Sequence, residues 1–314
     1  MKHIVSVSGG KDSALTLTLA YEKYGKDIIA LFCDTGNEHQ YVYDYLNYLE
    51  DKFNIKIHRL KADLSHRVIN KRKFIANDIR VGRNKQGVLK RWQPKRKRVA
   101  LTDGLKVSGN PMLDLCQWKG RFPSRKAQFC TQFLKTSLLE RFQNEIYENN
   151  EVTIWTGVRR DESAARANIK EHEEVAEGFF FNRPLADMST EDVFSMLIKY
   201  GIKRNTLYDL GFSRVGCMPC INARKEEIRL MAKLFPEMVE KIRYWERVVG
   251  DSSRRGLSSF FHTRTKGLSA YDAFNEANID ATIEWSKTSR GGKQYGFFNE
   301  EPSETCLLAE GACE

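Results

Sequence analysis

The sequence predicts an α/β protein with a doubly wound parallel sheet, followed by a helical C-terminal region. Two observations lead to this prediction. Short apolar runs that suit buried strands alternate with amphipathic helical stretches over residues 3–61. Beyond about residue 185 the hydrophobic pattern is helical. Because parallel strands need long crossover connections, strands that alternate with helices favour a parallel sheet.

The individual elements follow from the spacing of apolar residues. The expected strands are residues 3–8, 27–34, 56–61 and 152–158, and the expected helices between the first three are 12–23 and 40–53. Within 40–53, Val42, Leu46, Leu49 and Phe53 recur at helical spacing. The order βαβαβ places the carboxyl ends of these strands at one edge, where such sheets bind ligands.

Two domains are expected. Residues 1–185 are expected to form an α/β domain, interrupted by a basic insertion at about 65–110. Residues 186–314 form a helical region that carries a C-x-x-C motif and a mobile tail. Its first helix begins at a capping-box pattern, Ser189-Thr190-Glu191-Asp192.

Charge and composition limit the classes of function. The chain has 314 residues and a formal charge of +10, and Lys71–Arg98 contains twelve Lys or Arg residues, one acid and Trp92. A basic run with an aromatic residue suits a phosphate backbone, so contact with tRNA or DNA is predicted there; a solvated insertion is the alternative. We expect no membrane span and no signal peptide, hence a cytoplasmic protein whose seven cysteines do not form a disulfide framework.

A glycine-rich loop directly follows the first expected strand. It consists of Ser8, Gly9, Gly10, Lys11, Asp12 and Ser13. The glycines let backbone N–H groups approach an anion, and the helix that follows adds donors and a positive dipole end. Lys11 adds a cation, and Asp12 is a candidate ligand for Mg²⁺. The spacing differs from that of the P-loop and matches the loop of ATP pyrophosphatases, which cleave ATP between the α and β phosphates.

Four segments together resemble the phosphoadenosine phosphosulfate (PAPS) reductase family, which has a Rossmann-like adenine-nucleotide α-hydrolase fold. They are Ser8–Ser13, Asp34-Thr35-Gly36-Asn37-Glu38, Thr156–Ser163 with Arg166, and Arg183-Pro184-Leu185 running to Asn205-Thr206-Leu207-Tyr208. The same segments also resemble those of DNA phosphorothioation and tRNA thiolation enzymes. The resemblance implies that the stretch with Asp34 and Thr35 lies beside the nucleotide, and the position of ligands at strand ends places Ser8, Asp34 and Gly157 around the same cleft. The resemblance also implies catalytic roles for Lys11, Asp12, Arg159 and Arg160, the arginines reaching phosphates or sulfate. A surface ion pair with Asp161 or Glu162 is the alternative for those arginines.

The cysteines suggest a metal centre. Iron–sulfur members of this family hold a [4Fe–4S] cluster with a cysteine pair and a C-x-x-C, and here Phe129 stands where one cysteine of the pair would be. The resemblance therefore implies three ligands, Cys130, Cys217 and Cys220, with Cys116 as a candidate fourth. Zinc on the same cysteines, a thioredoxin-like redox pair and a structural pair are the alternatives.

Three functions remain open. In the first, ATP adenylates an acceptor, expected on nucleic acid, and a donor such as a cysteine desulfurase supplies the sulfur; the chain is then an ATP pyrophosphatase and sulfurtransferase. In the second, it is an oxidoreductase that reduces PAPS or adenylyl sulfate (APS) to sulfite. The Glu-Cys-Gly-x-His nucleophile motif of those reductases is missing, although Cys306 or Cys313 could act from the tail. The third is a nucleotide-binding regulator without turnover.

Overall fold

The structure, a computed structural model, describes residues 1–83, 86–91, 94–262 and 265–288. The described residues form two compact units. Unit 1 comprises those within Met1–Ala62 and Arg125–Asn222, and unit 2 those within Asp63–Ser124 and Ala223–Phe297. No helix among the described residues is long and apolar enough to cross a membrane.

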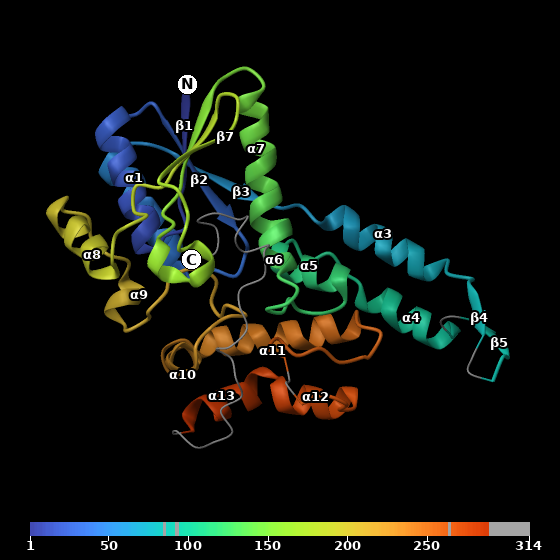
Figure 1. The fold of residues 1–314 in the computed structure, drawn as a ribbon. Helices are drawn as coiled ribbons and strands as arrows, with labels where there is room; N and C mark the ends of the chain where they lie inside the picture. The colour runs from blue at the N-terminus through green and yellow to red at the C-terminus, as the bar shows by residue number, and fades with distance from the viewer. Residues whose placement is uncertain (84–85, 92–93, 263–264, 289–314) are drawn as a thin grey trace. The chain divides into compact units, whose positions relative to one another are not determined.

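Unit 1 is built on a six-stranded, mostly parallel sheet (Figure 1). Its strands, in spatial order, are β3 (Ile57–Lys61), β2 (Ile28–Asp34), β1 (Lys2–Ser6), β6 (Val152–Trp155), β8 (Phe179–Asn182) and β7 (His172–Ala176). The first five are parallel, and β7 is an antiparallel edge strand paired with β8. The predicted fold class is thus confirmed. The β7–β8 pair is not predicted from the sequence, because β7 is largely polar and exposed and lacks the apolar alternation of a strand.

Helices cover both faces of this sheet. α1 (Lys11–Tyr24) packs against β1, β2 and β6, while α7 (Ser137–Tyr147) packs against β2, β3 and β6 on the other side (Figure 1). Leu139 of α7 lies in a buried cluster with Ile4, Leu31 and Ile154 from the three central strands. The other elements of unit 1 are α2 (Gln40–Phe53), α6 (Phe129–Thr131), η1 (Gln132–Thr136), η2 (Arg160–Glu162), η3 (Ala164–Arg166), α8 (Thr190–Lys199) and α9 (Thr206–Asp209). α8 begins at the predicted capping box, with Ser189 and Asp192 bonded reciprocally.

Unit 2 is mainly helical. It contains α3 (Ser65–Ala76), the hairpin β4 (Val81–Arg83) and β5 (Leu89–Arg91), α4 (Lys95–Gly104), α5 (Pro111–Lys119), α10 (Lys225–Leu234), α11 (Pro236–Asp251), α12 (Ala270–Ala277) and α13 (Ile279–Lys287). α11 packs on α4 and α5, and α3 packs on the same two helices. The basic insertion therefore folds together with the C-terminal helices. This division of the chain differs from the expected boundary near residue 185.

A buried carboxylate holds two loop ends of unit 2. Glu246 on α11 is 4% exposed and accepts hydrogen bonds from the backbone N–H groups of Phe260 (2.7 Å) and Ile279 (3.1 Å). Glu246→Ala would leave both buried donors without this acceptor. We expect it to lower the free energy of unfolding by about 2–5 kcal/mol, since each unsatisfied buried group costs about 1–3 kcal/mol. Urea unfolding followed by circular dichroism measures the loss.

Glu246→Gln keeps an acceptor oxygen and separates charge from hydrogen bonding. Burial raises the pKa of Glu246 from 4.5 to about 7, although the two backbone bonds oppose the rise. Between pH 4.5 and 7 the folded state binds more protons at this site than the unfolded state, so the site's contribution to stability falls as pH rises through that window. The Gln variant should lose this pH dependence. An unchanged pH dependence in that variant would contradict the assignment.

Candidate functional site

The glycine-rich loop joins β1 to the N-terminus of α1. Its turn is closed by serine hydroxyls: the Ser8 N–H donates to Ser13 Oγ (3.0 Å), and the Gly10 N–H donates to Ser8 Oγ (3.3 Å). Ser13 Oγ in turn donates to the Gly10 carbonyl (3.1 Å). The first intrahelical bond of α1 starts from Ala14, so the earlier first-turn N–H groups have no intrahelical acceptor. This arrangement is a polar, preformed loop at a helix N-terminus, as anion binding requires.

Two glycines are required by close approaches. Gly9 has a φ of +83°, and a Cβ there would lie 2.9 Å from Val42 Cγ1 of α2. Gly157 follows β6, and a Cβ there would lie 2.8 Å from the backbone carbon of Asp12. Gly157 therefore lets the end of β6 touch the start of α1. Gly157, predicted at the end of its strand, thus lies against Asp12 of the loop.

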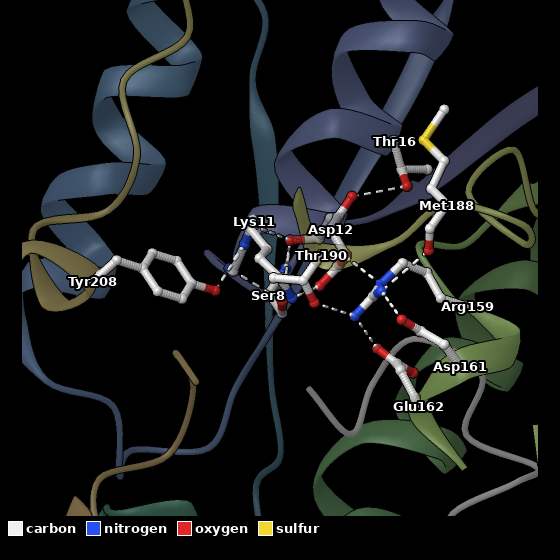
Figure 2. Close-up of polar contacts among 12 residues, drawn as sticks. Ser8, Lys11, Asp12, Thr16, Arg159, Asp161, Glu162, Met188, Thr190 and Tyr208 are labelled. Carbon is white, nitrogen blue, oxygen red and sulfur yellow. Dashed lines mark hydrogen bonds and ion pairs between the residues drawn. The ribbon is translucent and has the colours of Figure 1, made fainter. Parts of the chain in front are cut away.

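Asp12 is enclosed by two cations (Figure 2). Its side chain is 1% exposed and ion-paired with the Lys11 ammonium, and its Oδ1 lies 2.8 Å from Arg159 Nε. The Arg159 guanidinium is 5% exposed and also contacts Asp161 (2.7 Å), the Met188 carbonyl (3.1 Å) and Thr190 Oγ1 (3.1 Å). Both carboxylate oxygens of Asp12 thus lie against cations, an arrangement that does not fit a Mg²⁺ ligand. Asp12 holds Lys11 and Arg159 in place instead.

Arg160 lies apart from this cluster. Its Nε donates to the Ile169 carbonyl (2.9 Å), and its guanidinium pairs with Asp187. Part of the predicted catalytic set is therefore brought together, namely Lys11, Asp12 and Arg159, and Arg160 is not. Arg159 also makes the carboxylate contacts that were the alternative for it, with Asp161 and, more distantly, Glu162 (3.8 Å).

Two residues that were not predicted as site residues bond to the backbone of the glycine-rich loop. The Lys11 N–H donates to Tyr208 Oη (3.0 Å), 197 positions later in the chain (Figure 2). Asn205 is fully buried, and its Nδ2 donates to the carbonyls of Gly9 (3.3 Å) and Tyr41 (3.2 Å) while its Oδ1 caps α9. Both residues belong to the Asn205–Tyr208 segment, one of the four segments that resemble the family. That resemblance was the one indication in the sequence that they lie at the site.

A second polar cluster lies at the end of β2. Thr35 Oγ1 donates to Glu38 Oε1 (2.6 Å), and Tyr43 Oη donates to Asp34 Oδ1 (2.8 Å). Cys217 pairs with Glu38 through an isolated bridge, and its Sγ lies 3.4 Å from Thr35 Oγ1 and 3.6 Å from Glu38 Oε1. Burial raises the pKa of Glu38. Burial, the Glu38 carboxylate and Cys220 together raise the pKa of the Cys217 thiol, which favours the protonated thiol over the thiolate.

The structure does not assemble the predicted cluster ligands. Cys217 and Cys220 interact, but the part of the chain that the structure describes contains no group of three or more His, Cys, Asp or Glu side chains placed to hold a metal ion. Cys130 lies in α6 of unit 1, and Cys116 is buried in α5 of unit 2. The described residues therefore do not fit a [4Fe–4S] or zinc site, and Cys306 and Cys313 lie outside them.

Comparison with known proteins places this geometry in context. Residues 2–223 match the sequence model of the phosphoadenosine phosphosulfate reductase domain. An uncharacterized 37.8 kDa protein of Escherichia phage 186 is 40% identical, over 99% of this chain and 96% of that protein. An uncharacterized protein of Methanocaldococcus jannaschii is 27% identical, over 80% of this chain and 42% of that protein.

Two further similarities involve proteins with a stated activity. The adenosine 5′-phosphosulfate reductase of Burkholderia cepacia is 37% identical over 75 residues, which is 23% of this chain and 30% of that enzyme. Among solved structures, the phosphoadenylyl-sulfate reductase of Candida auris aligns with a TM-score of 0.42 and 14% identity, over 70% of this chain and 83% of that one.

Proposed function

Because the chain belongs to the phosphoadenosine phosphosulfate reductase domain family, we propose that its Ser8–Ser13 loop binds ATP and cleaves it between the α and β phosphates. In this proposal an acceptor is adenylated and then receives sulfur, so the protein is an ATP pyrophosphatase that serves a sulfurtransferase reaction. The observation that carries the proposal is the complete loop at the start of α1, with Lys11 fixed by Asp12 and Asp12 fixed by Arg159.

The proposed first step is a displacement at phosphorus. An acceptor oxygen attacks the α-phosphorus, and the bond to the bridging oxygen of the β-phosphate breaks. The electron pair of that bond leaves with pyrophosphate, and AMP remains on the acceptor. Negative charge develops on the leaving group, so donors already aimed at it lower the barrier. The Lys11 ammonium and the positive end of the α1 dipole stabilise this charge, while Asp12 and Arg159 position Lys11.

The remaining parts of the proposal concern the acceptor and the sulfur. We propose a nucleic-acid acceptor and a separate sulfur donor such as a cysteine desulfurase. The described residues offer no metal centre for sulfur delivery, so no step is assigned to a cluster. Thr156, whose buried hydroxyl has no hydrogen-bond partner among the described residues, is a further polar group beside Gly157 at the edge where the nucleotide would lie.

Reduction of adenylyl sulfate to sulfite is the second candidate. The local identity with adenosine 5′-phosphosulfate reductases favours it, since the same loop edge could hold the nucleotide part of either substrate. It needs a nucleophilic cysteine, and Cys217 is poorly suited because its raised pKa keeps the thiol protonated.

Parallel assays rank the two candidates. Purified protein receives either PAPS or APS with reduced thioredoxin, or ATP with tRNA or DNA. We expect pyrophosphate release from ATP and no sulfite. Sulfite formation that disappears in Cys306→Ser or Cys313→Ser would reverse the ranking. Nucleotide binding without either product would favour the regulator.

A further inference from the structure

Positive charge is concentrated in unit 2. The sequence segments assigned to it, residues 63–124 and 223–297, carry 30 Lys or Arg and 14 Asp or Glu, a formal charge of +16. The whole chain carries +10, so the rest of the sequence is negative by 6. Such a separation attracts a polyanion to one part of the molecule.

A cavity of about 780 Å³ gathers part of this charge. It is lined by α3, α5, α12 and the segment 252–262, and its described wall includes Lys71, Lys119, Arg121, Arg254 and Arg255. The one acid of that wall is Asp78, which already forms an ion pair with Arg80 (2.8 Å). The volume is that of a ligand site, and the charge of the wall selects an anion.

Two further hollows adjoin this cavity and extend it into what we call the unit 2 groove. One shares Lys71, Phe74 and Trp118 with the cavity and adds His66, Arg67 and Asn70. The other shares Leu101, Ser253, Arg254 and Arg255 and adds Lys97 together with two acids, Asp103 and Asp251. Its cations outnumber its acids by three to two, so each of the three adjoining hollows is lined by more cations than acids. Such a series matches a chain of phosphates better than it matches one small anion.

Cations in the groove are crowded. Lys71 is partly buried and donates to the Gln117 carbonyl (2.7 Å), and burial together with Arg254 lowers the pKa of Lys71 to about 8. Burial, Arg67 and Arg121 lower the pKa of Lys119 in the same direction. Like charges held close together are stabilised when an anion enters.

Aromatic rings lie along the same groove. The Arg67 guanidinium lies 4.6 Å and the Lys119 ammonium 4.0 Å from the centre of the Trp118 ring. These cation–π contacts hold both cations at the wall of the groove. Phe74 is 55% exposed, and the Arg80 guanidinium lies 5.0 Å from the centre of its ring. An exposed ring beside basic side chains can stack on an unpaired base, which favours a single strand over a duplex.

We propose that unit 2 binds single-stranded nucleic acid along this groove, with phosphates against Lys71, Lys119, Arg121 and Arg254 and a base against Phe74. This inference rests on the proposed function and deepens it, because it names the surface that holds the acceptor strand. It also relocates the predicted contact. Of the cations in Lys71–Arg98, only Lys71 and Lys97 line the described groove.

The test is fluorescence anisotropy with labelled oligothymidine and oligouridine, without ATP, between about 50 and 200 mM salt. The groove variant carries Lys119→Gln, Arg121→Gln and Arg254→Gln. We expect its affinity to fall about tenfold or more, and its plot of log K against log salt to flatten by about 2, from roughly 0.7 per lost phosphate contact. Phe74→Ala should weaken binding about fivefold or more with the salt slope unchanged.

A matched control separates the groove from general charge. Arg229→Gln, Lys233→Gln and Arg247→Gln remove the same charge from exposed positions on α10 and α11 of unit 2. Equal loss in both triple variants, duplex binding as tight as single-strand binding, or no binding by the wild type near 50 mM salt would overturn the proposal. The two strands show whether DNA or RNA is preferred. Because the binding assay contains no ATP, it does not depend on the proposed cleavage of ATP. Strand binding by a protein that releases no pyrophosphate would support the groove and would contradict only the proposed cleavage.

Discussion

Arg159→Ala should lower the stability of unit 1 by about 3–5 kcal/mol, because it leaves the Asp12 carboxylate without one of its two buried cations. Asp12 is 1% exposed, so water cannot replace the guanidinium. The variant also loses contacts to the Met188 carbonyl and Thr190. Urea unfolding monitored by circular dichroism measures the change.

The neighbouring arginine supplies the control. Arg160 pairs with Asp187 at the surface, where both side chains are well solvated, so Arg160→Ala should cost about 1 kcal/mol or less. The double variant Asp12→Asn with Arg159→Met should lose less than the sum of the two single changes, since neither member of the Asp12–Arg159 pair is then left as a buried charge without the other. Equal losses in Arg159→Ala and Arg160→Ala would mean that the buried pair does not hold the loop.

Lys11→Ala should slow pyrophosphate release about 100- to 1,000-fold, the usual effect of removing one donor to developing charge. It should also weaken ATP binding by about 1.5–3 kcal/mol, as expected for a lost hydrogen bond to a charged group. Calorimetry gives the affinity, and a pyrophosphate assay gives the rate. Lys23→Ala, which changes an exposed lysine in the last turn of the same helix, should alter neither. Wild-type affinity in the Lys11 variant would remove Lys11 from the site.

The sequence was sufficient for the parts of the site that are local. Ser8–Ser13 follows an apolar strand and opens a helix, so its place at the sheet edge could be predicted from spacing alone. The same rule placed Asp34 and Gly157 at strand ends. Gly157 does lie against Asp12, and Asp34 instead bonds Tyr43 and the Gly36 N–H.

What could not be predicted depends on long-range packing. Arg159 and Arg160 are adjacent and chemically alike, yet Arg159 pairs with Asp12 and Arg160 with Asp187. The bond between Lys11 and Tyr208 joins positions that local patterns cannot relate. The basic segment at about 65–110 was expected to be an insertion in the nucleotide-binding domain. In the structure α4, which lies in this segment, packs on α11, more than 130 positions later in the chain. The resemblance implied three cysteine ligands, but a shared motif does not fix whether side chains converge, and the part of the chain that the structure describes contains no group of three His, Cys, Asp or Glu side chains placed to hold a metal ion.

The most direct test of the proposed chemistry is the identity of the products that wild-type protein forms from ATP labelled in the α-phosphate, in the presence of nucleic acid. Cleavage between the α and β phosphates predicts pyrophosphate and AMP-derived label in equal amounts, with both products absent in Lys11→Ala. Labelled ADP with inorganic phosphate, or equal product formation by Lys11→Ala, would contradict the account.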